Sequence, residues 1–207
     1  MIVHISPSNG KMGPIPSVSL PAGETCRKDA PCYKKCYARR LEAFRTTVHD
    51  SYVDNLAVLI QDPSTYWREV EASIMMSRYF RFHVAGDIPD PDYLERMMYV
   101  TNRNQHCDVL CFSKQYEIGN DYLRRHEKSD PIGLGVPENM HFVYSVWKGL
   151  ECPNPYRMPE AHILYKDGTT TARPDAIPCS GNCTDCAKHE GGCWKLKRGD
   201  QLVIKEH

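Results

Sequence analysis

The chain of 207 residues carries 26 basic and 26 acidic side chains, and 41% of its residues are hydrophobic. A zero formal charge gives no indication of a nucleic-acid surface, and no apolar run approaches the roughly 20 residues that span a bilayer. The opening segment MIVHISPSNG lacks the basic and then apolar pattern of a secretory signal, so we expect a cytoplasmic protein. Because the sequence contains no linker or internal repeat, residues 1–207 are expected to form a single domain.

The first part of the chain predicts turns followed by helices. Residues 1–25 are rich in proline and glycine around one short apolar segment, SVSL, which predicts a strand. Between residues 37 and 61, apolar side chains recur at helical spacing, which predicts one long helix or two. Asp62 and Pro63 have the residue types of an N-cap and a first helical position, and they begin the next predicted helix.

From residue 79 onward, strand and helix patterns alternate. The segment YFRFHVAGD predicts a buried strand, and Asp90 and Pro91 begin the helix that follows it. A helix is also predicted over residues 115–128. Three further strands are predicted, at residues 108–114, 141–147 and 161–166. This alternation indicates an α/β fold with a mostly parallel sheet, which is either open or closes into an incomplete or small (β/α) barrel.

Several chemically active side chains follow the predicted strands. In a parallel sheet the carboxyl ends of the strands meet at one edge, where α/β proteins place their chemistry. Cys26 follows the first predicted strand, Asp87 the second and Lys114 the third, so we expect them at one edge, with Asp87 and Lys114 as catalytic candidates. His83 and Gly86, which precede Asp87, are candidates for contact with a cofactor. Ordinary roles stay open, because histidines occur in cores and aspartates cap turns.

Seven of the ten cysteines fall into two groups. The N-terminal cysteine group consists of Cys26, Cys32 and Cys36. The C-terminal cysteine group consists of Cys179, Cys183, Cys186 and Cys193, and it begins a cysteine-rich extension over residues 179–207. Spacings of two to six residues let thiolates converge on a metal, so we expect both groups to be metal ligands.

Two other roles for these cysteines are weighed against a metal cluster. Disulfides are disfavoured, because the chain is long enough to bury a core and its first residues carry no secretory pattern. Zinc fits the spacing of the C-terminal group as well as a cluster does. Neither group has a histidine at zinc-finger spacing, apart from His189, which competes with Cys193. The thiolate-only composition of both groups favours iron and sulfur over zinc.

Four segments carry a resemblance to a known family. They are CYKKCYA at residues 32–38, FRFHVAGD at 80–87, FSK at 112–114, and the cysteine-rich segment at the end. In this pattern the chain resembles the gene product eighty-eight family of phage and bacterial proteins over nearly its whole length. The resemblance implies a bacterium or a phage-infected host as its location, and it points to iron and sulfur without naming a reaction.

The chain also resembles, more loosely, the radical S-adenosylmethionine enzymes, because three cysteines follow the first strand of an α/β chain. That resemblance implies a barrel-like core and a [4Fe–4S] cluster on the N-terminal group, with one iron left open for S-adenosylmethionine. The spacing here is C-x5-C-x3-C, whereas the superfamily has C-x3-C-x2-C. The superfamily spacing occurs instead at Cys179, Cys183 and Cys186.

Three cysteines lie outside the two groups. Cys111 falls within an apolar strand pattern, which predicts a small buried side chain. Cys107 and Cys152 fall in predicted loops, where each is either an ordinary thiol or a fourth ligand for the N-terminal group. Base rates favour the ordinary thiol for both.

Three functional hypotheses follow from the sequence. The first is an iron–sulfur protein with two [4Fe–4S] clusters, in which the N-terminal cluster is reactive, the C-terminal one relays electrons, and Asp87 and Lys114 orient a substrate or S-adenosylmethionine. The second is a non-enzymatic protein whose metal sites are structural and whose surface binds a partner. The third is a zinc protein with two structural sites. The small-molecule substrate and the electron donor are not identified by the sequence.

Overall fold

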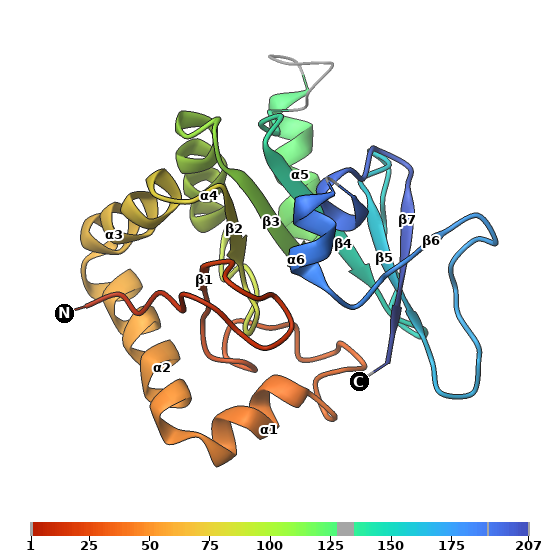
Figure 1. Cartoon of the computed structure of the whole chain (residues 1–207), viewed down its shortest axis with the longest axis horizontal. Coiled ribbons are helices and arrows are strands. Elements are labelled where there is room, and N and C mark those ends of the chain that lie inside the picture. Colours follow the sequence, from red (N-terminus) through yellow and green to blue (C-terminus); the bar gives the residue numbers. More distant parts are fainter. Residues whose placement is uncertain (1, 128–134, 190, 207) are drawn as a thin grey trace.

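The computed structural model describes residues 2–127, 135–189 and 191–206, and it is built on one parallel sheet (Figure 1). The strands are β1 (Ser17–Val18), β2 (Tyr79–Phe82), β3 (Asp108–Ser113), β4 (Met140–Val146), β5 (Glu160–Leu164), β6 (Ile177–Pro178) and β7 (Gln201–Lys205). Their order in the sheet is β1-β2-β3-β4-β5-β7-β6, and every neighbouring pair is parallel. The predicted α/β class with a largely parallel sheet is therefore confirmed.

The sheet is open within the described residues. β1 pairs only with β2, and β6 pairs only with β7, so the two edges of the sheet do not meet. Of the two arrangements that the sequence allowed, an open sheet and an incomplete or small barrel, the structure has the open one. Two of its seven strands are only two residues long, which leaves little backbone for closing a barrel.

The helices begin close to where the sequence predicts them. They are α1 (Tyr37–Phe44), α2 (Thr46–Gln61), α3 (Pro63–Met75), α4 (Pro91–Arg103), α5 (Tyr116–His126) and the short α6 (Cys183–Lys188), followed by a 3₁₀ turn, η1 (Gly192–Trp194). The carboxylates of Asp62 and Asp90 accept hydrogen bonds from the backbone N–H groups of Thr65 and Tyr93, so both predicted N-caps are confirmed. Residue 128, the predicted end of α5, lies outside the described residues, as do residues 190 and 207 of the cysteine-rich segment.

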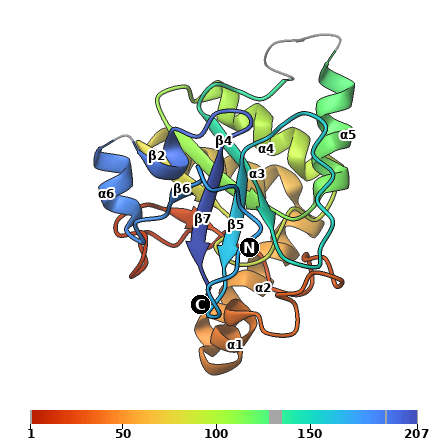
Figure 2. The ribbon, with the colours of Figure 1, turned by 90° about the vertical axis from the view of Figure 1, so that its right-hand side faces the viewer.

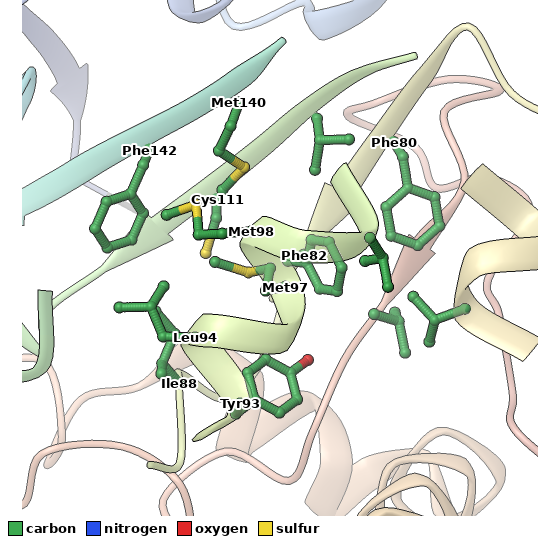
Figure 3. Close-up of a cluster of buried hydrophobic side chains, with 14 of the residues drawn as sticks. Phe80, Phe82, Ile88, Tyr93, Leu94, Met97, Met98, Cys111, Met140 and Phe142 are labelled. Carbon is green, nitrogen blue, oxygen red and sulfur yellow. The ribbon is translucent and has the colours of Figure 1, made fainter. Parts of the chain in front are cut away.

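One face of the sheet packs against α2 to α5 and forms the larger core. Phe80 and Phe82 point from β2 into this core, where they meet α3 and α4 (Figure 3). Cys111 lies among the same apolar side chains and is fully buried, which confirms its predicted role as a small core residue. Fully buried side chains of this kind supply most of the driving force for folding.

The opposite face is covered by α6, η1 and the N-terminal residues. Trp194 in η1, Met12 and Ile15 pack there against Leu110 in β3 and Val143 in β4. Figure 2 shows α6 and α5 on opposite sides of the sheet. The C-terminal cysteine group therefore belongs to a second, smaller apolar layer.

The last part of the chain contributes two strands that the sequence analysis did not predict. β7 pairs with β5 from Glu160↔Gln201 to Leu164↔Lys205, and β6 pairs with β7. The cysteine-rich segment is thus held between strands of the main sheet. No described helix is long and apolar enough to cross a membrane.

Candidate functional site

The N-terminal cysteine group lies in the connection between β1 and α1. Cys26, Cys32 and Cys36 are all half-buried, and Cys36 immediately precedes the first residue of α1. Burial raises the pKa of Cys26 to about 11 and also raises the pKa of Cys32. Burial thus favours the thiol forms of Cys26 and Cys32, and a metal that binds them must displace their protons.

Hydrogen bonds fasten this connection to the carboxyl ends of β2 and β3. The Thr25 hydroxyl accepts a hydrogen bond of 3.0 Å from the backbone N–H of Asp87, and the Thr25 carbonyl accepts one of 3.1 Å from Gln115. Gly86 has a φ of +76°, and a Cβ there would lie 2.6 Å from the carbonyl oxygen of Leu20. Glycine is therefore required at residue 86 so that the two backbones can approach each other.

Asp87 joins the ends of two strands. Its carboxylate accepts hydrogen bonds from the Ser113 hydroxyl at 2.6 Å, the Lys114 backbone N–H at 2.9 Å and the Ile88 backbone N–H at 2.8 Å. Burial raises the pKa of Asp87, while the Lys114 charge and these hydrogen bonds act in the opposite direction. Asp87 is only 4% exposed. Its carboxylate therefore connects the ends of the two strands beneath the surface of the site.

Lys114 places a positive charge beside the N-terminal group. Its ammonium lies 5.8 Å from the centre of the Trp147 ring, and it lowers the pKa values of Cys26 and Cys32 against the larger effect of burial. The Arg27 guanidinium donates a hydrogen bond to the Lys114 carbonyl at 3.4 Å. The structure thus brings two of the predicted cysteines together with both catalytic candidates, Asp87 and Lys114.

His83 lies in the larger core. Its ring packs 5.3 Å from the Tyr93 ring of α4, and it is only 4% exposed. Neither ring nitrogen has a hydrogen-bond partner among the described residues, and burial lowers the pKa of His83 to about 3, which favours the neutral imidazole. Its φ of +58° is uncommon for a residue with a side chain. The structure places this cofactor-contact candidate against α4, while Gly86 lies at the edge beside Leu20.

The C-terminal cysteine group is assembled from β6, α6 and η1. The backbone N–H of Cys179 donates to the Val203 carbonyl in β7 at 2.8 Å, and that of Cys183 donates to the Lys11 carbonyl at 3.4 Å. Burial raises the pKa of Cys193 to about 12, and the other three cysteines of the group add to the increase. All four cysteines pack against the smaller core, so the group is a half-buried cluster of thiols.

Two details show how closely the backbone surrounds these sulfurs. The Ser180 hydroxyl lies 3.2 Å from the Cys186 sulfur. A Cβ at Gly192 would lie 2.9 Å from the same sulfur, so a larger residue at this position would displace Cys186. Short polar and glycine residues that let backbone approach sulfur are typical of thiolate-bound metal sites.

The donor chemistry of both groups fits a thiolate-bound cluster. Each combines neighbouring thiols with nearby cations, Lys114 at the N-terminal group and Arg81 and Lys11 at the C-terminal one. Among the described residues, however, no set of three or more His, Cys, Asp or Glu side chains has the arrangement for holding a single metal ion. In the C-terminal group, neighbouring cysteines raise the pKa values of Cys183 and Cys193.

Some residues of these sites were not singled out by the sequence analysis. Thr25 and Gln115 tie the connection to the sheet, and Arg81 lies beside the C-terminal group. The sequence could have indicated Arg81, because it is the one charged residue in the apolar strand segment YFRF. Cys107 is fully buried, and Cys152 lies near Tyr116.

Comparisons with known proteins give one match. The family model described as Gene product 88 matches residues 5–195, which is most of the chain. The comparisons with curated proteins and with solved structures found no match. The matched range includes both cysteine groups, Asp87 and Lys114.

Proposed function

The chain belongs to the Gene product 88 family, and we propose that this member is an iron–sulfur protein with two [4Fe–4S] clusters. Cys26, Cys32 and Cys36 would hold one cluster, and the C-terminal cysteine group would hold the other. The observation that carries the proposal is the same at both places: half-buried thiols gather next to a cation, without a histidine among the ligands. Thiolate-only ligand sets favour iron–sulfur clusters or zinc over harder metals.

The difference between the two groups supports a reactive role for the N-terminal one. Four thiolates saturate the C-terminal centre, whereas three thiolates leave one iron of a cluster without a protein ligand. A bound [4Fe–4S] cluster with an open iron supplies one-electron reduction and a binding position for a substrate or for S-adenosylmethionine. The N-terminal group also lies at the carboxyl edge of a parallel sheet, the edge that hosts chemistry in α/β proteins.

The residues around the N-terminal group have separate tasks in this proposal. Lys114 binds an anionic group of the small molecule, such as the carboxylate of an amino acid, because its ammonium stands beside the thiols and over Trp147. The Asp87 carboxylate accepts a hydrogen bond of 2.9 Å from the Lys114 backbone N–H. This contact fixes the backbone from which the Lys114 side chain extends.

The C-terminal centre combines a structural task with electron relay. Trp194 anchors η1 to the sheet, because its ring lies 5.0 Å from the Tyr79 ring and 5.7 Å from the His141 ring. The Tyr79 hydroxyl anchors α6 by donating to the Ala187 carbonyl. A purely structural, non-enzymatic protein that binds a partner is the alternative that this anchoring favours. The experiments below separate it from the catalytic proposal.

The first test is the metal content after anaerobic purification. We expect a brown protein with about eight iron and eight sulfide per chain, because each cluster contains about four of each. Replacing the N-terminal group with serine, as Cys26→Ser, Cys32→Ser and Cys36→Ser together, should remove about half of the iron. The corresponding change in the C-terminal group should remove the other half, and Cys107→Ala serves as the control because Cys107 is buried in the larger core. Stoichiometric zinc without sulfide would contradict the proposal.

The second test concerns the small molecule. Lys114→Met should weaken the binding of S-adenosylmethionine at least tenfold, because a charge-assisted contact is lost, while the iron content stays unchanged. Lys148→Met is the matched control, since Lys148 is exposed at the same edge of the sheet. If clusters are present but neither the wild type nor the variants bind or cleave S-adenosylmethionine under strong reduction, the radical role is excluded.

A further inference from the structure

Arg81 is directed towards the C-terminal cysteine group by the alternation of β2. Side chains of a strand point alternately to its two faces. Phe80 and Phe82 enter the larger core, so Tyr79 and Arg81 point to the opposite face. The Tyr79 hydroxyl reaches α6 by donating to the Ala187 carbonyl at 2.8 Å. Arg81 therefore lies beneath the segment that carries the four cysteines.

The surroundings of Arg81 are apolar. One guanidinium nitrogen lies 3.5 Å from the sulfur of Met12, and the guanidinium carbon lies 5.2 Å from the centre of the Phe112 ring. Its Nε is buried and has no hydrogen-bond partner among the described residues. In the part of the chain that the structure describes, no carboxylate forms an ion pair with this half-buried side chain. A partly buried cation is stabilised by a nearby anion, and no described carboxylate supplies one.

The segment at Lys11 and Met12 joins Arg81 to the C-terminal cysteine group. The Arg81 guanidinium lies beside the Met12 sulfur, and the Met12 carbonyl accepts a hydrogen bond of 2.9 Å from the Thr184 hydroxyl in α6. The backbone N–H of Cys183 donates to the carbonyl of Lys11, the residue before Met12. Arg81 and α6 therefore contact the same short segment on the same face of the sheet.

We propose that Arg81 is the counter-cation of a negatively charged metal–thiolate centre on the C-terminal cysteine group and that it raises the reduction potential of that centre. Four thiolates around a [4Fe–4S] cluster carry a net negative charge, and reduction adds one more electron to it. A cation beside the sulfurs stabilises the reduced form more than the oxidised form. The inference rests on the proposed function and assigns Arg81 a positioning and tuning role, without contact to a substrate.

The test uses the full chain with the N-terminal group replaced by serine, so that one cluster remains to be measured. In that parent we compare Arg81→Met, which keeps length but removes charge, with Arg81→Lys, which keeps the charge. Arg81→Met should make the midpoint potential more negative and should increase the rate of cluster loss to an iron chelator at least fivefold. Arg81→Lys should fall between Arg81→Met and the parent in both measurements.

Lys188→Met is the matched control, because Lys188 is an exposed cation on α6 itself. It should leave the potential and the rate of cluster loss close to those of the parent. A parent that holds a cluster, together with an Arg81→Met variant of unchanged potential and unchanged cluster loss, would overturn the role of Arg81 alone. A parent that holds no metal would overturn the proposed function of the C-terminal group and this inference with it.

Discussion

Cysteine residues serve different purposes in this chain, and their surroundings distinguish them. Cys107 and Cys111 are fully buried, and burial raises the pKa of each thiol well above its usual value. Such thiols behave as small apolar side chains. The seven grouped cysteines are half-buried instead, and a lysine or an arginine lies near four of them, namely Cys26, Cys32, Cys183 and Cys193. The sequence predicted the grouping, the role of Cys111 and the place of Lys114 near Cys26, whereas Arg81 came only from the structure.

Glu160 shows how a polar network is built into the same sheet. Its carboxylate accepts hydrogen bonds from Asn154 at 2.9 Å and Gln201 at 2.6 Å, and it pairs with His162 at 2.9 Å. The hydrogen bond with His162 is the largest of several effects that hold the pKa of Glu160 at about 2, below its ordinary value of 4.5. The charged form is thus favoured in the folded state.

Glu160→Gln should therefore destabilise the protein in a pH-dependent way. Because the folded-state pKa is depressed, the contribution of Glu160 is complete above about pH 4.5 and is lost as the pH falls towards 2. We expect a loss of about 1 to 2 kcal/mol at pH 7 after allowance for solvent screening. Urea midpoints at pH 7 and pH 3 test this, with exposed Glu138→Gln as control. An equal loss at both pH values would contradict the prediction.

At the scale of elements, local signals were sufficient for helices and less so for strands. The N-caps Asp62 and Asp90 act within three residues along the chain, which is why the sequence shows them. The predicted helical region 37–61 is two helices, α1 and α2, that meet at Arg45. β7 was missed because its residues QLVIK are stabilised as a strand by pairing with β5, which is distant in sequence.

Gly119 in α5 gives a prediction at this scale. In a helix interior, alanine is more stable than glycine by about 1 kcal/mol, so Gly119→Ala would stabilise an isolated helix. Here, however, a Cβ at residue 119 would lie 2.5 Å from the hydroxyl oxygen of Tyr144, a fully buried side chain in β4. The steric conflict should prevail and lower the free energy of unfolding by about 1 to 3 kcal/mol, measured by urea denaturation.

The matched control for this prediction is the same substitution in a Tyr144→Phe background. The hydroxyl that the new Cβ would meet is then absent, so Gly119→Ala should cost less there than in the wild type. Tyr144→Phe has a cost of its own, because that hydroxyl donates to Asn120 at 2.9 Å. An equal cost of Gly119→Ala in both backgrounds would show that the contact with Tyr144 is not the cause.

At the scale of the whole molecule, the two faces of the sheet differ in what stabilises them. The face with α2 to α5 buries a large continuous core of aromatic and aliphatic side chains. The other face is covered by a smaller layer that includes the C-terminal cysteine group and Trp194. Figure 2 shows α6 on this side of the sheet. The N-terminal group lies in a connection without regular structure between β1 and α1. Metal binding is therefore expected to stabilise these segments more than the main core.

Hydrogen exchange measured with and without iron and sulfide checks that expectation. On anaerobic reconstitution, amides in residues 26–36 and 179–189 should exchange at least tenfold more slowly, because the ligands restrict local opening. Amides of α4, whose buried apolar side chains belong to the larger core, should change little. Uniform protection over the chain, or none in the two cysteine segments, would contradict this division of stability.

The sequence by itself determined the features that depend on neighbouring residues. Helix starts, the alternation of strands and helices, and the grouping of cysteines can be recognised in short stretches of chain. Strands that alternate with helices are parallel, because each helix returns the chain to the same end of the sheet. The tertiary structure alone decided that the sheet stays open, that Asp87 joins β2 to β3, and that Arg81 lies beneath the C-terminal cysteines. These features depend on contacts between residues far apart in sequence, which local propensity does not encode.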